Sequence, residues 1–256
     1  MIFESHAHYD DKAFDKDREE LLNSFIDQGI GYVVNIGSNL TSSQKTIELT
    51  RKHSFIYGSV GVHPSDTTDM MEDDIQLLKD MASEDKVVAI GEIGLDYYWN
   101  TPEADIQKHW FNKQMELAKG VKLPLVIHSR DAAKDTYDMI RDAGLEEENA
   151  GVIHCFAYSK EMAKQFIDLG FYIGVGGVLT FKNGRKLKEV VEYIPLESIL
   201  LETDAPYLSP EPNRGKRNSS LNLKHIAEEI ARIKNIDYDD VIHITRDNAM
   251  KLFNIY

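Results

Sequence analysis

Two histidines separated by one alanine stand near the start of the chain, in the segment FESHAHYD at residues 3–10. An isolated His-x-His pair is most often two surface imidazoles, because short metal-binding patterns arise frequently by chance. Imidazole nitrogens are also common ligands of transition metals. His6 and His8 therefore indicate a metal site only if further ligands are placed to meet them.

Other residues of metal-binding type follow, each at the end of a predicted apolar strand. Five of the nine histidines share this placement with a glutamate and an aspartate: His6, His8, His63, Glu92, His128, His154 and Asp204. Singly, each has an ordinary explanation, such as a core histidine, a solvated carboxylate or a cap. Burying so many titratable groups in one place is costly unless they bind something charged. Their common position therefore predicts a bound cation.

The number of candidate ligands indicates how many ions they hold. A catalytic zinc takes about three protein ligands, whereas the six candidates here are His6, His8, Glu92, His128, His154 and Asp204. They suit two divalent ions bridged by Glu92, which together would hold a hydroxide and stabilise a phosphoryl oxygen. Asp204 would also take the proton of the attacking water, so Glu92 and Asp204 are the predicted catalytic residues. Zinc, manganese, magnesium, iron and nickel all suit these ligands.

Carboxylates are also predicted behind the ligands. Strand side chains alternate, so Glu4 shares a face with His6 and would lie one layer below it. From there Glu4 would accept a hydrogen bond from a ligand imidazole and fix its tautomer. The same alternation places Glu202 beneath Asp204. A bridging lysine is not expected, because Lys86 lies at the beginning of the strand that Glu92 ends.

A repeating framework must position these side chains. Short β-rich apolar runs alternate with longer amphipathic stretches along the chain. Strands are predicted at residues 2–6, 31–37, 56–62, 87–93, 123–128, 151–156, 171–177 and 198–204. Helices are predicted at 15–28, 41–53, 72–84, 103–119, 131–143, 159–169, 184–194, 220–234 and 238–253.

This order predicts an α/β fold, a (β/α)8 TIM barrel with an extra C-terminal helix. Active sites of such barrels lie at the carboxyl ends of the strands, where the candidate ligands stand. An open doubly wound sheet would usually carry a glycine-rich turn after its first strand, and here His-Ala-His follows instead. No linker divides the sequence, so residues 1–256 are predicted to form one domain.

Composition limits the location and the partners. The N-terminus has no signal-peptide pattern and no apolar run is long enough to span a membrane, so a cytoplasmic protein is expected. The single cysteine, Cys155, is predicted to be a buried, inert thiol. A formal charge of −14 argues against binding nucleic acid by bulk electrostatics. A polyanion would be held locally, by metal ions or by the basic cluster at 213–218.

The ordered motifs resemble those of TatD-type metal-dependent deoxyribonucleases, which are amidohydrolase-like metal barrels. The segments are FESHAHYD, VGVHP, AIGEIGLDYYW, LPLVIHSRDA, VIHCF, YIGVGGVLTF, LLETDAPYLSPEPNRGKRN and RDNAMKLFNI. They cover essentially the whole chain. The resemblance implies a DNA phosphodiesterase with one ion on His6, His8 and Glu92. It implies a second ion on Glu92, His128 and His154, with Asp204 completing the site.

The resemblance extends to substrate contacts and has two departures. It implies that the substrate phosphates contact His63, Arg130, Arg214 and Arg217. The family commonly has aspartate at the position of Glu4. It usually has a proline two residues after the RGKRN segment, where this chain has Ser219 and Ser220. A more mobile loop is expected there.

The predicted activity is exonucleolytic hydrolysis of single-stranded DNA, with no obligate protein partner. An acidic surface disfavours tracking along a duplex but admits a chain end to a small positive mouth. Another ester or amide hydrolase, such as an aminoacyl-tRNA deacylase or a small-molecule amidohydrolase, would use the same ions. A non-catalytic protein that keeps its metal for stability is a third interpretation. The ligand set disfavours it, because a structural site needs only about four ligands.

Overall fold

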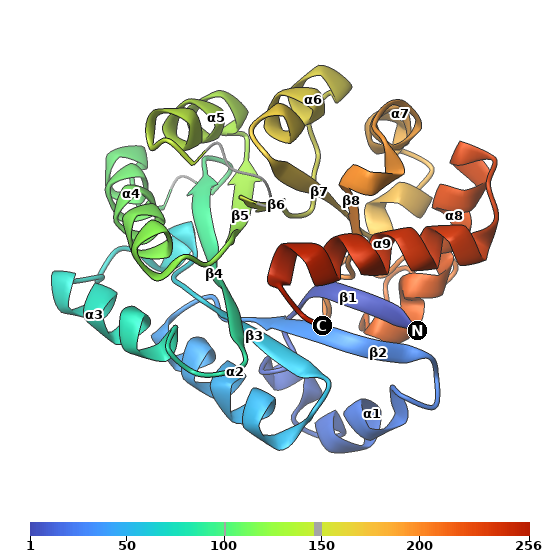
Figure 1. The fold of residues 1–256 in the computed structure, drawn as a ribbon, viewed down its shortest axis with the longest axis horizontal. Coiled ribbons are helices and arrows are strands. Elements are labelled where there is room, and N and C mark those ends of the chain that lie inside the picture. Colours follow the sequence, from blue (N-terminus) through green and yellow to red (C-terminus); the bar gives the residue numbers. More distant parts are fainter. Residues whose placement is uncertain (100, 146–149) are drawn as a thin grey trace.

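Eight parallel strands form the centre of the fold and follow one another in sequence order around a near-closed barrel (Figure 1). The computed structural model describes residues 1–99, 101–145 and 150–256. The strands are β1 (Ile2–Ala7), β2 (Ile30–Ile36), β3 (Ile56–Val60), β4 (Val87–Asp96), β5 (Leu125–Arg130), β6 (Gly151–Ile153), β7 (Phe171–Val175) and β8 (Ile199–Leu201). The predicted TIM-barrel class is therefore confirmed.

Helices alternate with these strands and surround the barrel (Figure 1). They are α1 (Arg18–Ser24), α2 (Leu40–Lys52), α3 (Glu72–Met81), α4 (Ala104–Val121), α5 (Ala133–Asp142), α6 (Lys160–Asp168), α7 (Arg185–Tyr193), α8 (Leu223–Lys234) and α9 (Tyr238–Phe253). Single 3-10 turns lie at Lys12–Phe14, Pro64–Asp66, Gly177–Thr180, Leu196–Ser198 and Ser220–Asn222. The predicted extra C-terminal helix is α9. None of the described helices has the length and apolarity needed to cross a membrane.

The alternation of strand side chains divides the apolar core into two layers. Outward-facing residues such as Val33 and Ile127 join the core that the surrounding helices cover. Their neighbours Val34 and Val126 belong to a separate cluster that also contains Phe253 of α9. Helix α9 lies across β1 and β8 (Figure 1). The barrel interior is thus filled with apolar side chains on the side that α9 covers.

The barrel closes between β1 and the residues that follow β8. The short β8 makes no regular ladder with β1, but Ala7 and Ala205 form a parallel bridge. The amide of Asp204 donates to the carbonyl of His6 at 2.9 Å, and the amide of His8 donates to that of Ala205 at 2.8 Å. Closure of the barrel therefore brings Asp204 beside the two histidines of β1.

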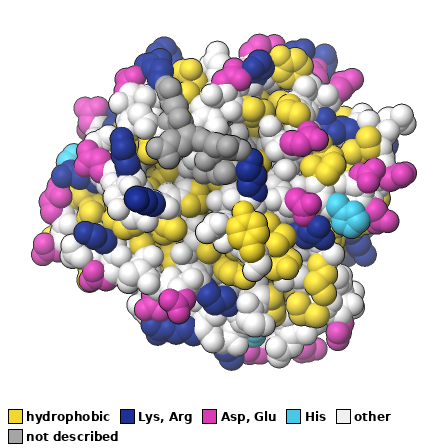
Figure 2. Space-filling model, in the orientation of Figure 1, with side chains coloured by type: hydrophobic (Ala, Val, Ile, Leu, Met, Phe, Trp, Pro, Cys, Tyr) yellow, Lys and Arg dark blue, Asp and Glu magenta, His cyan; other side chains and the backbone are white. Residues whose placement is uncertain are grey.

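Charges of both signs are mixed on the face toward the viewer in Figure 2, which has the orientation of Figure 1. Lysine and arginine side chains there are interspersed with aspartate and glutamate. This face therefore does not present the continuous basic surface that binding a nucleic acid duplex by charge alone requires.

Candidate metal centre

The two carboxylate oxygens of Glu92, near the end of β4, face two different groups of donor atoms. Oε1 lies 2.7 Å from Nε2 of His154 and 3.0 Å from Nδ1 of His128. Oε2 lies 3.6 Å from Nε2 of His6 and 3.7 Å from Nε2 of His8. Oδ1 of Asp204 lies 3.3 Å from Nε2 of His8. The structure thus brings all six candidate ligands together, with Glu92 between the two groups.

Spacing within each group matches donors that share an ion. Two nitrogens bound tetrahedrally to zinc, each about 2.0–2.1 Å away, stand about 3.3 Å apart. Nε2 of His6 and Nε2 of His8 are 3.3 Å apart, and Nδ1 of His128 and Nε2 of His154 are 3.2 Å apart. These distances match two nitrogens bound to one ion, so these residues fit a metal site.

Two candidate ligand histidines are oriented by hydrogen bonds from the ring nitrogen that faces away from Glu92. Nδ1–H of His8 donates to the carbonyl of Ile36 at 2.9 Å, which turns Nε2 toward Glu92. Nε2–H of His128 donates to Oδ2 of Asp96 at 3.0 Å, which turns Nδ1 toward Glu92. His128 therefore lies between two carboxylates, and these raise its pKa to about 9 even though burial opposes the charge. A positive charge, carried by a proton or a metal ion, belongs at this position.

Asp96 is a site residue that the sequence reasoning missed. It ends β4, is almost fully buried, and also accepts the backbone N–H groups of Tyr98 and Trp99 through Oδ1. A signal was present, because Glu92 and Asp96 are four positions apart in the segment GEIGLD, and strand alternation places such residues on one face. The predicted strand ends at residue 93, so Asp96 was not considered as a residue of the strand end, whereas β4 continues to Asp96.

Two glycines let the strands approach one another at the site. A Cβ on Gly94 of β4 would lie 2.0 Å from the carbonyl oxygen of His128. A Cβ on Gly174 of β7 would lie 2.3 Å from Oε2 of Glu202. Only glycine can occupy positions where another backbone or a buried side chain comes this close.

Glu202 lies behind His154 in the barrel interior. Its Oε1 accepts the backbone N–H of Cys155 at 2.5 Å and is 4.0 Å from Nδ1 of His154. Burial raises the pKa of Glu202 to about 8. Nδ1 of His154, Nδ1 of His6 and Oε2 of Glu202 are buried without a hydrogen-bond partner among the described residues. The interior beneath the ligands is therefore polar and incompletely satisfied, which is common at functional sites.

The predicted contact of Glu4 with a ligand imidazole is wrong. Oε1 of Glu4 accepts the backbone N–H groups of His6 at 3.2 Å and Thr203 at 2.9 Å. Oε2 accepts the hydroxyls of Thr203 at 2.6 Å and Ser220 at 2.8 Å. The segment that follows β8 passes closer to Glu4 than the imidazole does, so the carboxylate ties β1 to the segment that carries Asp204.

Hydrogen bonds hold the segment after RGKRN, where a more mobile loop is expected from the sequence. Ser220 is fully buried, and its backbone N–H donates to the hydroxyl of Tyr9 at 2.8 Å. The side-chain amide of Asn218 donates to the carbonyls of Thr203 at 2.9 Å and Tyr207 at 2.7 Å. These bonds replace the restraint that a proline would supply and fix the loop against the barrel.

The carboxylates of Glu92 and Asp204 are held in the ionised form. Burial opposes ionisation of Glu92, but the charge of His154 and hydrogen bonds with His128 and His154 keep its pKa well below the usual value. Burial likewise opposes ionisation of Asp204, and the contact with His8 lowers its pKa. Ionised carboxylates among imidazoles are the form that binds divalent cations.

His63 is oriented to donate a hydrogen bond through Nε2. Its Nδ1 accepts the backbone N–H of Ser65 at 3.2 Å, so in the neutral ring the proton resides on Nε2. Burial and the neighbouring His128 lower its pKa to about 3, which keeps the ring neutral. Nε2 lies 3.7 Å from Oε1 of Glu92. His63 therefore presents an N–H group at the site and not a lone pair.

These residues line a cavity of about 270 Å³ that opens to solvent. Its wall contains His8, Asp10, Asp11, Ser38, His63, Glu92, His128, His154, Asp204 and Tyr207. The hydroxyl of Tyr207 donates to Oδ2 of Asp11 at 3.3 Å. Tyr207 was not predicted, although it follows Asp204 closely in the segment TDAPY.

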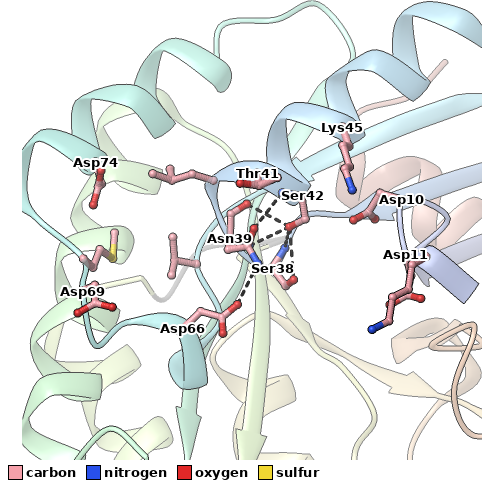
Figure 3. A pocket seen from close by; sticks show the side chains of 14 residues that line it. Asp10, Asp11, Ser38, Asn39, Thr41, Ser42, Lys45, Asp66, Asp69 and Asp74 are labelled. Atoms are coloured by element: carbon pink, nitrogen blue, oxygen red, sulfur yellow. Dashed lines mark hydrogen bonds between the residues drawn. The ribbon is translucent and has the colours of Figure 1, made fainter.

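A second cavity of about 590 Å³ adjoins the first and shares Asp10, Asp11 and Ser38 with it. Figure 3 shows Asp66, Asp69 and Asp74 on one side of the start of α2, with Asp10 and Asp11 on the other. The start of α2 is closed by its own cap, since Asn39 and Ser42 exchange side-chain to backbone hydrogen bonds, each 2.9 Å long. The larger cavity is therefore acidic, and the cap engages the backbone N–H of Ser42 at the start of α2.

None of the described arginines lines the metal cavity, including the three predicted to contact phosphate. Arg217 makes a bidentate ion pair with Asp17, at 2.7 and 2.6 Å, so the structure does not support its predicted role. The guanidinium of Arg214 lies over the ring of Phe181 at 4.2 Å. Arg130 ends β5 and lies over the ring of Tyr98 at 3.7 Å.

Two further expectations concern Lys86 and Cys155. Nζ of Lys86 donates to the carbonyls of Thr50 at 2.8 Å and His53 at 2.6 Å, so it bonds to the end of α2 and its following residue and does not bridge the ligands. Cys155 is only partly buried, so the predicted full burial is wrong. Desolvation still raises the pKa of its thiol well above the usual value, so this cysteine is not activated as a nucleophile.

Comparisons with known proteins identify the family. The family model described as TatD related DNase matches residues 3–254. The uncharacterized metal-dependent hydrolase YabD of Bacillus subtilis is 41% identical, over 100% of both chains. The 3'-5' ssDNA/RNA exonuclease TatD of Salmonella typhimurium is 31% identical, over 99% of both chains. The crystal structure of YJJV, a TatD homolog from Escherichia coli K12, superposes with a TM-score of 0.94 at 28% identity, covering 100% of this chain and 98% of that one. This chain belongs to the TatD-related DNase family of metal-dependent hydrolases.

Proposed function

We propose that this protein hydrolyses phosphodiester bonds of single-stranded DNA from a chain end, using two divalent ions held around Glu92. The observation that carries the proposal is the division of donors between the oxygens of Glu92. Donors on the Oε2 side are His6, His8 and Asp204, and those on the Oε1 side are His128 and His154. A carboxylate shared in this way is the arrangement by which proteins hold two neighbouring ions.

The residues of the site have distinct roles in the proposed reaction. Bound ions would supply a hydroxide nucleophile and neutralise charge on the phosphoryl oxygen. Asp204, whose side chain is 16% exposed in the cavity, is placed to orient the attacking water and take its proton. Nε2–H of His63 is placed to donate to a phosphate oxygen. Glu92 keeps the two groups of ligands in a single arrangement.

Charge and size favour a single strand over a duplex. The chain carries a formal charge of −14 and its metal cavity is about 270 Å³, which suits a chain end better than a helix about 20 Å wide. The Salmonella relative is named as an exonuclease on single-stranded DNA and RNA.

The proposal is tested with metal-free protein reconstituted with zinc, manganese, magnesium, iron or nickel. End-labelled single-stranded DNA, duplex DNA, single-stranded RNA and an uncharged aryl ester are then offered as substrates. We expect single-nucleotide products from single-stranded DNA with at least one ion. Turnover of the ester without cleavage of any nucleic acid would overturn the proposal.

One observation favours the alternative, a hydrolase of another ester or amide. Among the described residues, the wall of the metal cavity contains no lysine or arginine to bind a neighbouring phosphate. A phosphate-bearing polymer therefore needs a binding surface outside this wall.

A further inference from the structure

Two exposed aromatic side chains and an arginine lie together at the carboxyl ends of β4 and β5. Tyr98 is 55% exposed and Trp99 is 64% exposed, and their rings meet edge to face at 5.0 Å and 88°. The guanidinium of Arg130 lies 3.7 Å from the ring centre of Tyr98 and 5.9 Å from that of Trp99. We call Tyr98, Trp99 and Arg130 the β4–β5 platform.

One carboxylate connects this platform to the metal centre. Oδ2 of Asp96 accepts a hydrogen bond from the ligand His128, while Oδ1 accepts the backbone N–H groups of Tyr98 and Trp99 at 3.0 and 3.2 Å. Arg130 follows His128 by two positions on β5, so both side chains point to one face, about 7 Å apart along the strand. A molecule held on the platform would therefore lie beside the metal centre.

Arg130 differs from the other two predicted phosphate contacts in its charge environment. Arg217 is neutralised by Asp17, and Arg214 lies within 4.0 Å of Glu211. No carboxylate of the described residues forms an ion pair with Arg130. Its positive charge is therefore directed to solvent and to the two rings, and arginine binds phosphate well in such a setting.

The side of the metal centre formed by the segments after β1, β2 and β3 is acidic and disfavours phosphate. The larger cavity beside β1 and β2 contains five aspartates, Asp10, Asp11, Asp66, Asp69 and Asp74, against two lysines, Lys12 and Lys45 (Figure 3). A polyanion that enters the metal centre is thus disfavoured on that side. Over β4 and β5 it meets a cation and two aromatic faces.

We propose that the β4–β5 platform binds an unpaired nucleobase of the substrate strand by stacking, while Arg130 contacts the phosphate next to it. Exposed aromatic faces beside a cation are the elements with which proteins hold single-stranded nucleic acid without reading its sequence. A duplex cannot offer its stacked bases to these rings, so the platform also selects unpaired strands. This inference rests on the proposed phosphodiesterase function and names the part of the substrate that the cavity wall does not bind.

Binding is measured first, without turnover. The chain has two tryptophans, of which Trp110 is 8% exposed, so Trp99 is the solvent-accessible fluorophore. The metal-loaded protein is titrated with oligothymidylate whose phosphorothioate linkages resist hydrolysis. We expect quenching of the tryptophan emission by this oligomer, none by the same oligomer with abasic residues, and none in Trp99→Phe. Equal quenching by the abasic oligomer would overturn base stacking.

Kinetics supply the second measurement. We expect Trp99→Ala to raise KM for oligothymidylate about 5- to 150-fold, the range for loss of one base–aromatic stack. Its kcat for methyl 4-nitrophenyl phosphate, which has no nucleobase, should remain within twofold of wild type, and Trp99→Tyr should restore most of the affinity. The matched control is Tyr193→Ala, because Tyr193 is 52% exposed with Nζ of Lys160 5.4 Å from its ring centre on another part of the surface.

These outcomes separate the two proposals. Cleavage of both substrates with unchanged KM in Trp99→Ala would overturn the platform and leave the phosphodiesterase intact. If no phosphodiester were cleaved with any ion, the proposed function itself would fail. An equal loss on the oligomer and the small phosphodiester would show that Trp99 supports the metal centre instead of binding a base.

Discussion

The hydroxyl of Ser220 donates a 2.8 Å hydrogen bond to Oε2 of Glu4, joining residues 216 positions apart. These are the two positions at which the sequence departs from the pattern of the family it resembles. A shorter aspartate would not reach as far, and a proline at position 220 would supply neither the hydroxyl nor the N–H that bonds Tyr9. The bond ties β1 to the segment that carries Asp204. We therefore expect the two departures to compensate each other.

This relationship predicts coupled effects on stability. Ser220→Ala should lower the free energy of unfolding by about 1–3 kcal/mol, because it removes a donor from a buried carboxylate. Glu4→Asp should also destabilise, and the double variant should lose about 1 kcal/mol less than the sum of the two, since the shorter acid no longer needs the hydroxyl. Urea unfolding measures all three, with Ser219→Ala as the control. Strict additivity would contradict the compensation.

Removing a ligand on one side of Glu92 should reduce the number of bound metal ions by one. We expect about two ions per chain in the wild type, about one in His8→Ala and about one in His128→Ala, because each variant loses ligands on one side only. Glu92→Gln should lose most of both, since the bridging charge is gone. Elemental analysis after dialysis against the metal-free buffer measures these contents. Complete loss of metal in His8→Ala would contradict the prediction that the two groups of ligands bind their ions independently.

Asp96→Asn should weaken metal binding without removing a ligand. Asp96 orients His128 by accepting its Nε2–H, and loss of such a partner typically costs 10–100-fold in metal affinity or activity. Competition with a chromogenic chelator measures the affinity. Asp105→Asn, an exposed position in the first turn of α4, is the matched control. An unchanged affinity would remove Asp96 from the site.

Asp204→Asn should lower kcat by about 100- to 10,000-fold, the usual contribution of a proton acceptor. The fold should persist, because the backbone amide of Asp204, and not its side chain, bonds the carbonyl of His6. Circular dichroism and steady-state kinetics on single-stranded DNA measure the two properties. If kcat stayed at the wild-type value, the proton would be taken by another group.

Substitution of Arg130 and substitution of Arg217 should have different effects on DNA binding and cleavage. Arg217→Ala should leave cleavage of single-stranded DNA within about twofold of wild type, because its guanidinium is bound to Asp17. Arg130→Ala should weaken binding and reduce its dependence on salt, because a phosphate contact is lost. Fluorescence anisotropy across a salt series compares the two variants. Equal losses would restore the original prediction for Arg217.

Much of this site follows from the sequence by itself. Histidines and acids recur at the ends of apolar runs, and parallel strands of a barrel place all such ends at one face. The barrel and the meeting of His6, His8, Glu92, His128, His154 and Asp204 could therefore be predicted from local patterns. The partners of these groups could not. Strand register and the course of the loops bring together segments that no local sequence pattern relates. The resulting pairs are Asp96 with His128, Asp17 with Arg217 and Glu4 with Ser220. Tertiary structure alone decided which nitrogen of each histidine faces inward, and how the charged side chains are distributed around the candidate metal centre.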